Sequence, residues 1–230
     1  MHLQASTSLD KAKETGKSFI EVIHKLSTTC EYIRQIWKGT LNMKSPTFSL
    51  DGDRRLRELI LYIAEKSCSD PAFGATKLNK LLFYSDFLAY LNFGKAVTGQ
   101  DYFRLENGPA PRRLLPIRQS MIEDGDIIVQ KAEFCGFPQD RVVALRPANK
   151  DEFAPHELSL IDKVLELHKG KTASEISEES HEFVGWSLAQ DKETIPYEVA
   201  RLSTKQILTD EELEYGKHLE NEAVALSSAV

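Results

Sequence analysis

The segment from Lys77 to Gly94 constrains the fold most, because it predicts a helix with apolar side chains around nearly its whole circumference. The apolar positions are Leu78, Leu81, Leu82, Phe83, Tyr84, Phe87, Leu88 and Leu91. A helix that is apolar on every side is buried rather than laid on a surface. We expect it to start near Thr76, a candidate N-cap, and to end at Gly94. The rest of the chain must then be arranged around this helix.

A turn-rich segment follows, with the dipeptide Gly108-Pro109 just ahead of an arginine-rich stretch. Proline is tolerated in the first turn of a helix, so Pro109 or Pro111 is expected to open a helix that continues to about Glu123. A buried helix followed by a stiffened turn predicts a scaffold that presents a surface, rather than a catalytic pocket.

The remaining pattern predicts a mainly α fold. Apolar residues at helical spacing predict further helices at 53–67, 155–168, 172–179, 195–202 and 210–226. Residues 127–134 and 141–145 predict an antiparallel hairpin with residues 135–140 as its loop, and residues 100–105 could add a third strand. We therefore expect a single helical domain with a small antiparallel β-hairpin or three-stranded sheet.

An N-terminal amphipathic helix is predicted over residues 8–38, followed by a linker that contains Gly, Pro, Ser and Thr. Its apolar stripe consists of Phe19, Ile23, Leu26, Cys30, Ile33 and Trp37. The stripe can pack on its own chain, or serve as a docking helix for a partner or for dimerisation. We divide the chain into an extension at 1–45 and a domain at 46–230 with acidic C-terminal helices. Met43 leaves an internal translation start open.

The net charge of −6 conceals an asymmetry along the chain. Residues 1–150 hold 22 basic and 17 acidic residues, whereas residues 151–230 hold 7 and 18. The acidic C-terminal third disfavours nucleic acid as a partner, because phosphate repels it. It suits a basic surface on another protein, or simply keeps the protein in solution.

Several classes of site are disfavoured. The cysteines, Cys30, Cys68 and Cys135, are too widely spaced for a metal cluster or a disulfide framework, so we expect them reduced and buried. No pair of the six histidines has a zinc-binding spacing, and no phosphate-binding or dinucleotide-binding glycine pattern occurs. Neither an 18-residue apolar run nor a secretory signal is present, so we expect a cytoplasmic protein without membrane attachment, metal or cofactor.

Two motifs resemble a known family. The first comprises Lys77-Leu78, Leu81-Leu82-Phe83-Tyr84, Gly94, Phe103 and Gly108-Pro109. The second comprises Ser180-His181, Trp186 and Ile195-Pro196. In this order they resemble the signature of the Panacea domain, found in SocA-like antitoxins and phage-associated proteins, over about residues 50–205. Ser180 stands where the family usually has Thr, and Val184-Gly185 stand where a small residue or proline usually precedes the tryptophan.

The resemblance implies an antitoxin without catalytic residues, whose partner is a cognate toxin usually encoded by an adjacent gene. Such a protein covers or distorts the active surface of the toxin, or presents the toxin to a cellular protease as an adaptor. The class of toxin and the choice between these mechanisms stay open. We expect contacts from Trp186, from the helix near Pro109, and from the stripe between Phe19 and Trp37.

Polar residues of the motifs have structural and functional interpretations. Asp86, on the buried helix, is expected to pair internally with an arginine or a backbone group. Lys77 and Tyr84 lie on other sides of that helix. His181 can bridge helices through its two ring nitrogens, while Trp186 can fill an internal pocket or anchor a partner.

Two other functions are left open by the sequence. The arginines near the Gly-Pro turn could follow a nucleic-acid backbone while a neighbouring aromatic ring stacks on a base. The residues concerned are Arg104, Arg112, Arg113, Arg118, Tyr102 and Phe103. His181 could instead serve a hydrolase together with a carboxylate or a cysteine. A nucleophile and base converging in an open cleft would favour the hydrolase, and packing of His181 against Trp186 would disfavour it.

Overall fold

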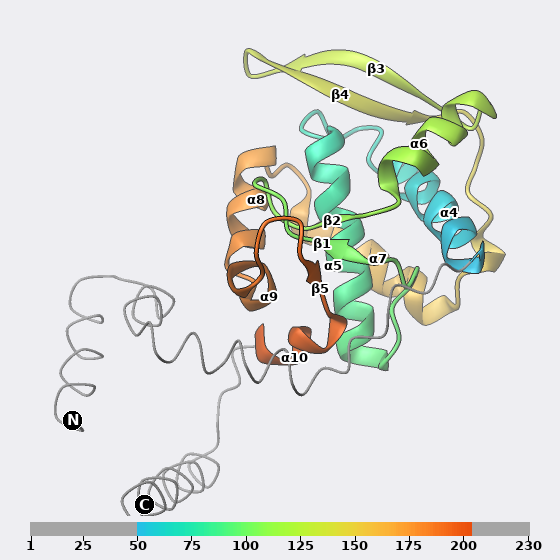
Figure 1. Ribbon diagram of the computed structural model, residues 1–230. Helices are drawn as coiled ribbons and strands as arrows, with labels where there is room; N and C mark the ends of the chain where they lie inside the picture. The colour runs from blue at the N-terminus through green and yellow to red at the C-terminus, as the bar shows by residue number, and fades with distance from the viewer. Residues whose placement is uncertain (1–49, 204–230) are drawn as a thin grey trace, which may run out of the picture.

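Helix α5 (Ala75–Phe93) stands at the centre of the molecule, as its apolar circumference predicts (Figure 1). The structure, a computed structural model, describes residues 50–203. The helix ends as expected at Gly94, which adopts the left-handed conformation (φ 72°) and donates its N–H to the carbonyl of Tyr90. The expected N-cap at Thr76 is wrong. The carbonyl of Gly74 already accepts from the N–H of Leu78 at 2.9 Å, so Thr76 lies inside the first turn.

Three helices pack around α5 and form the main core with it. They are α4 (Leu50–Lys66), α7 (Pro155–His168) and α8 (Ala173–His181). Fully buried side chains such as Leu59 of α4, Ile161 of α7 and Ile176 of α8 meet in one cluster. The bounds of α7 agree with the sequence prediction. The mainly α class is therefore confirmed.

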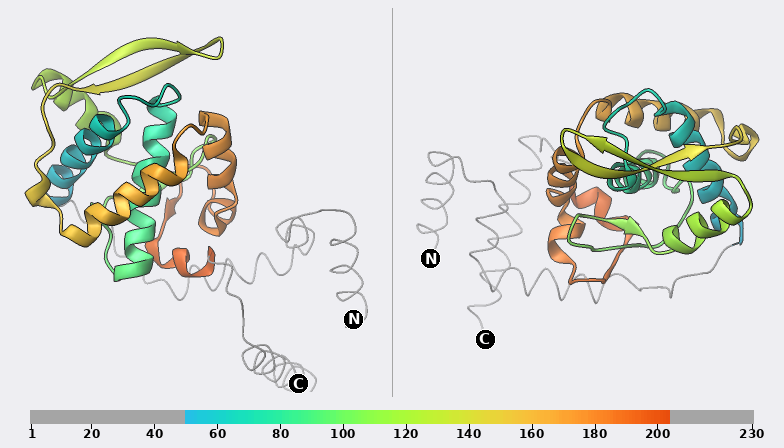
Figure 2. Two further views of the ribbon diagram at one scale, coloured as in Figure 1. Left: turned by 180° about the vertical axis from the view of Figure 1, so that it is seen from behind. Right: turned by 90° about the horizontal axis from the view of Figure 1, so that it is seen from above.

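The strands form two separate sheets. The short strand β1 (Tyr102–Phe103) pairs antiparallel with β2 (Ala110–Pro111) on one side and with β5 (Thr194–Ile195) on the other. Strands β3 (Ile127–Phe134) and β4 (Phe137–Ala144) form a hairpin of their own. The expected strand at 100–105 thus exists, but it does not extend the hairpin. Seen from above, the hairpin crosses over one end of α5 (Figure 2).

The hairpin turn is shorter than the predicted loop at 135–140. Cys135 and Gly136 both have positive φ, 52° and 81°, which is the backbone of a two-residue hairpin turn whose twist matches that of the strands. The ladder therefore reaches the tip, where Phe134 pairs with Phe137. Pro138 is tolerated within β4 because it lies opposite Glu133, where the missing N–H would point out of the ladder.

Three further expectations need correction. Helix α6 (Leu114–Glu123) begins after Pro109 and Pro111, because Ala110–Pro111 are drawn into β2. The predicted helix at 195–202 is split into β5, a 3₁₀ turn η2 (Tyr197–Val199) and α10 (Ala200–Ser203), since Thr194–Ile195 pair with β1. A second 3₁₀ turn, η1 (Lys150–Glu152), precedes α7. Cys68 and Cys135 are exposed rather than buried, because each lies in a surface turn.

Some expectations fall on parts of the chain outside the described residues. They concern the amphipathic stripe with Phe19, Ile23 and Trp37, and the predicted helix at 210–226, and they stay predictions. Among the helices of residues 50–203, none has the length and apolar character needed to cross a membrane.

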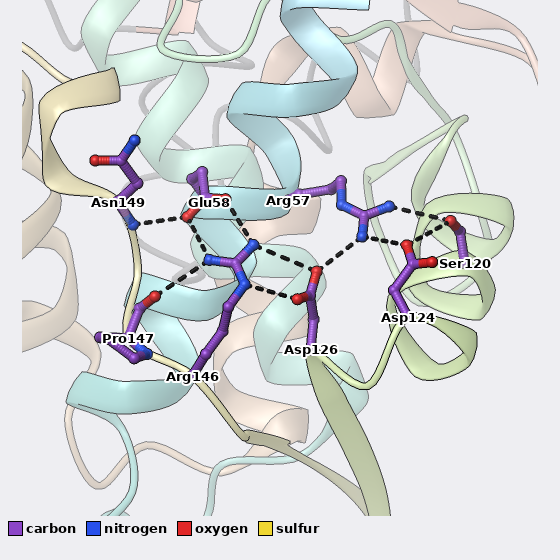
Figure 3. A network of polar contacts seen from close by, with 8 residues as sticks. All are labelled: Arg57, Glu58, Ser120, Asp124, Asp126, Arg146, Pro147 and Asn149. Atoms are coloured by element: carbon purple, nitrogen blue, oxygen red, sulfur yellow. Dashed lines mark hydrogen bonds and ion pairs between the residues drawn. The ribbon is translucent and has the colours of Figure 1, made fainter.

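A network of charged side chains ties the base of the hairpin to α4 (Figure 3). Arg146, just after β4, donates to Asp126, just before β3, at 2.6 Å and to Glu58 of α4 at 2.7 Å. Arg57 of α4 donates to Asp126 at 2.7 Å and also to Asp124. Burial raises the pKa of Glu58 and of Asp126, but hydrogen bonds and charge from these arginines outweigh it and lower both. For Glu58, the backbone N–H of Asn149 adds a further hydrogen bond at 2.7 Å that lowers the pKa. The network therefore fixes the direction in which the hairpin leaves the body.

Replacing Arg146 by methionine should lower the free energy of unfolding by about 2 kcal/mol at pH 7, because two partly buried carboxylates lose a donor. Carboxylates with a depressed folded pKa contribute stability that is present above their unfolded pKa and lost as pH falls. The difference in the free energy of unfolding between wild type and Arg146→Met, measured in urea titrations, should therefore become smaller below about pH 4. Arg54→Met, at a side chain that is 60% exposed, should change stability by less than about 0.5 kcal/mol. Equal losses in the two variants would contradict the role assigned to the network.

Candidate partner-binding site

The two sequence motifs meet at the loop between β1 and β2, residues 104–109. Gly108 closes a turn by donating its N–H to the carbonyl of Leu105 at 3.0 Å. Its φ of 97° is one that L side chains rarely adopt. A Cβ at this position would also collide with Ser180 Oγ and lie 2.7 Å from Lys80 Nζ. The turn therefore requires glycine both for its backbone conformation and for the close approach of two side chains.

An aromatic pair and an arginine hold one end of the loop. Trp186, on α9 (Val184–Leu188), donates from Nε1 to the carbonyl of Leu105 at 2.9 Å. His181 stacks on the Trp186 ring, with 3.9 Å between centroids and 15° between planes, and hydrogen-bonds the backbone of Glu106. The guanidinium of Arg104 lies 4.5 Å from the centroid of the same indole ring. His181 and Trp186 of the second motif thus both bind the backbone of the loop.

His181 is held as a neutral imidazole at neutral pH. Burial lowers its pKa, and the positive charges of Lys80 and Arg104 lower it further, against the hydrogen bond to Glu106. Its Nε2 is buried and has no hydrogen-bond partner in the part of the chain that the structure describes. The neighbouring Ser180 is fully buried and donates its hydroxyl to the carbonyl of Ser177 at 2.7 Å.

Lys80 of α5 holds the other end of the loop. Its Nζ donates to the carbonyl of Pro109 at 3.3 Å, and its side chain is only 1% exposed. No ion pair forms with it among residues 50–203, and burial lowers its pKa to about 8. A buried amine without a counter-ion destabilises a fold. We therefore interpret Lys80 as a positioning residue for the loop, not as a source of stability.

Lys77 and Tyr84 have structural contacts elsewhere on α5. Lys77 Nζ is buried and donates to Asp70 at 2.6 Å and to the carbonyl of Lys171 at 2.7 Å. The Tyr84 ring stacks on His168 with 4.6 Å between centroids and 19° between planes. These contacts tie α5 to the end of α7 and to the connection that follows α4.

Asp86 is fully buried and pairs internally, as expected, but not with an arginine. It accepts from the backbone N–H of Thr98 at 2.6 Å, from the Thr98 hydroxyl, and from the hydroxyl of Tyr102 at 2.8 Å. Neutral donors satisfy the carboxylate without bringing a second charge into the core. Burial raises the pKa of Asp86 against these hydrogen bonds. The result is that α5 is pinned to the segment that leads into β1.

The arginines near the turn are largely engaged within the protein. Arg112 donates to the carbonyl of Lys192 at 2.7 Å and lies 4.8 Å from the centroid of the Phe103 ring. Arg113 donates to Asp53 at 2.7 Å. Two of the arginines that could have followed a nucleic-acid backbone thus bind other parts of the protein, namely α4 and the segment before β5.

The loop exposes Glu106 and Asn107 at its tip. Two hollows among the described residues lie elsewhere. One, of about 510 Å³, lies between α4 and the end of β4, and the other, of about 230 Å³, lies between the ends of α4 and α7. Neither is lined by His181 or Trp186. The site is therefore an exposed loop tip on a fixed backbone.

Sequence reasoning did not place Lys80, Ser180 or the donors to Asp86 in the site. Lys80 carried a usable signal, because a lysine on a helix that is buried on every side must reach a specific acceptor. Thr98 carried none, since hydroxyl residues are common and nothing in the sequence links Thr98 to Asp86 twelve residues earlier. Ser180 stood in the second motif, but its close approach to Gly108 could not be seen from the sequence.

Gly108→Ala should destabilise the protein by about 2–4 kcal/mol. Alanine would have to adopt a backbone conformation with positive φ, and its Cβ would also clash with two buried side chains. Gly94→Ala is the matched control, since Gly94 also has a positive φ but its Cβ would meet nothing within 4 Å. The control should lose only about 1 kcal/mol in urea unfolding. Equal losses would show that the contact with Lys80 and Ser180 does not matter.

Lys80→Met should raise the free energy of unfolding at pH 7 by about 2 kcal/mol, since it removes a buried charge at the loss of one weak hydrogen bond. The folded pKa of Lys80 lies below its unfolded value, so the folded protein binds fewer protons in that window. Wild-type stability should therefore rise between about pH 8 and pH 10.5, and Lys80→Met should lack this rise. A variant that is less stable at pH 7 and keeps the pH dependence would contradict the assignment.

One of three comparisons with known proteins gave a match. The search of curated proteins and the search of solved structures each found no match. A family model described as Antitoxin SocA-like, Panacea domain, matches residues 78–187. This span contains Lys80, the Gly108-Pro109 turn, His181 and Trp186. The resemblance seen in the two motifs is thereby confirmed: over residues 78–187 this chain is similar to the SocA-like antitoxins of the Panacea family.

Proposed function

We propose that this protein is an antitoxin that neutralises a toxin protein by binding it directly, without catalysing a reaction. The family match supports the antitoxin role. The observation that carries the binding mode is the loop at 104–109, whose backbone is held by Trp186, His181 and Lys80 while its tip faces solvent. A surface that is fixed before binding loses little conformational entropy when the partner docks.

The surroundings of the loop indicate the chemistry of the partner. Glu106 at the tip, Glu178 on α8 and Glu182 just after α8 are all exposed. A basic face on the toxin would complement these carboxylates and speed the encounter. An interface of standard size buries about 1,600 Å² in total, so α8 and α9 would contribute alongside the loop.

The geometry of His181 argues against the hydrolase. Its ring packs on Trp186, and the adjacent Ser180 hydroxyl is fully buried and engaged with the carbonyl of Ser177. Nucleophilic catalysis needs a base and a nucleophile that converge where a substrate can enter. The arrangement suits a fixed binding surface better.

Co-expression with the product of the adjacent gene tests the proposal. Wild-type protein should restore growth and co-purify with an intact toxin. The double variant Glu106→Arg/Glu182→Arg should lose rescue and weaken binding by about a hundredfold, with unchanged thermal stability, because it puts positive charge against a basic face. Glu166→Arg, an exposed site on α7 with the same charge change, should rescue like wild type.

Two outcomes would contradict the proposal. One is a toxin that stays lethal in the presence of the wild-type protein. The other is a toxin that disappears when the protein is present and reappears when a cellular protease is removed, which would favour the adaptor mechanism over direct neutralisation.

A further inference from the structure

The β3–β4 hairpin has one covered edge and one open edge. Figure 1 shows β4 between β3 and the helices, with β3 outermost. On the β4 side, Arg141 donates to the carbonyls of Asp70 at 2.8 Å and Ser67 at 3.1 Å, and Gln139 donates to the carbonyl of Pro71 at 2.9 Å. The connection after α4 therefore covers β4. No described element covers β3 beyond its first residues.

The phase of the ladder shows which backbone groups of β3 point outward. Leu145 donates its N–H to the carbonyl of Asp126 at 2.8 Å, so these two residues form a hydrogen-bonded pair. Hydrogen-bonded and outward-pointing residues alternate along an antiparallel strand. The N–H and C=O groups of Val129, Lys131 and Glu133 therefore point away from β4. In the described part of the chain they have no partner.

An open edge of this kind is a template for another strand, and proteins usually protect such edges with proline, bulges or isolated lysines. Strand β3 contains neither a proline nor a bulge. Lys131, whose side chain is 83% exposed, would protect the edge if it stood alone. Glu133 lies two residues further on the same face and at the same edge, so the pair offers both signs of charge to an incoming strand.

This charge pattern is complementary to itself. If β3 pairs antiparallel with β3 of a second copy about a two-fold axis at Ala132, Lys131 stands opposite Glu133 of the second copy. The axis generates the same pair again. Registers centred on Lys131 or on Glu133 would instead set like charges opposite each other, which is destabilising. In the register centred on Ala132, outward-pointing residues also meet outward-pointing residues, so their N–H and C=O groups can bond.

The same register brings apolar side chains together. By the cross-strand pairing, Ile128, Phe134 and Phe137 lie on one face of the hairpin. Phe137 is 74% exposed and Ile128 is 46% exposed. In the paired arrangement Phe134 stands opposite Gln130 and diagonal to Ile128 of the second copy, within reach of a long or aromatic side chain.

We propose that this protein forms a two-fold dimer in which the β3 edges of two copies pair into a four-stranded antiparallel sheet. The occupant of the open edge is thus a second copy of this chain. The proposal does not depend on the toxin-binding role.

Sedimentation of the full chain tests the proposal through charge reversal. Wild type should be dimeric. Glu133→Lys should raise the dissociation constant of the dimer by about tenfold or more, because it creates two Lys–Lys oppositions. Lys131→Glu/Glu133→Lys should restore the dimer, since the exchanged charges are again complementary. Glu133→Lys is the cleaner single change, because Lys131 also pairs with Asp140 in its own hairpin at 2.6 Å.

Glu166→Lys serves as the control for charge change. At a protein concentration where every variant is monomeric, Glu133→Lys and Glu166→Lys should unfold at the same temperature as wild type. The double variant should unfold slightly lower, because it sets a glutamate opposite Asp140 in its own hairpin. Three results would overturn the proposal. The first is a wild-type monomer at about 100 µM. The second is a dimer that Glu133→Lys leaves intact, which would place the contact elsewhere. The third is a monomer whose β3 variants lose binding to another protein, which would assign the edge to a partner strand.

Discussion

The burial of the Lys80 amine beside the Gly108-Pro109 turn is the constraint on which the rest of the site depends. The amine reaches the carbonyl of Pro109 because residue 108 has no side chain in the way. Its positive charge also helps to keep His181 neutral, and His181 in turn holds the other end of the loop. The two ends are therefore coupled electrostatically as well as through the backbone.

Two kinds of interaction act mainly at different depths of the structure, with the buried ion pair between Lys77 and Asp70 as an exception. In the core, Asp86 collects a backbone N–H and two hydroxyls, which pin residues 98–102 to α5 just before the loop begins. At the surface, Arg57 and Arg146 bind carboxylates and set the base of the hairpin. Neutral donors suit the dry interior, where a second charge would need its own desolvation. Ion pairs suit the partly wet surface.

The sequence predicts the local parts of this fold well and the long-range parts poorly. The bounds of α7, the end of α5 at Gly94 and the position of β3 follow from periodicity and stop residues that act over a few positions. The short turn at Cys135-Gly136 was missed because it lacks the Asn-Gly or Asp-Gly pair that marks such turns. Helix α6 starts late because its expected first residues pair with β1 instead.

The site itself was predicted only as a set of residues. His181, Trp186 and Gly108 were singled out from the motifs, but the sequence did not show that all three act at the loop between β1 and β2. Trp186 reaches a carbonyl 81 residues away, and Lys80 reaches one 29 residues away. Backbone carbonyls carry no mark in a sequence, so side chains that bind them can be identified only when the loop is placed. Asp86 binds the hydroxyls of Thr98 and Tyr102 rather than an arginine. A neutral hydroxyl satisfies the carboxylate without adding a second charge to the core.

The distance along the chain between Leu105 and Trp186 also bears on synthesis at the ribosome. The loop is made early, while two of its three supports arrive about 80 residues later, after the hairpin and α7. Contacts that close such large loops form slowly compared with contacts inside one helix. Until residue 186 has emerged, the nascent chain holds the loop from the Lys80 end alone. The backbone conformation on which the proposed partner binding rests is therefore completed late in synthesis.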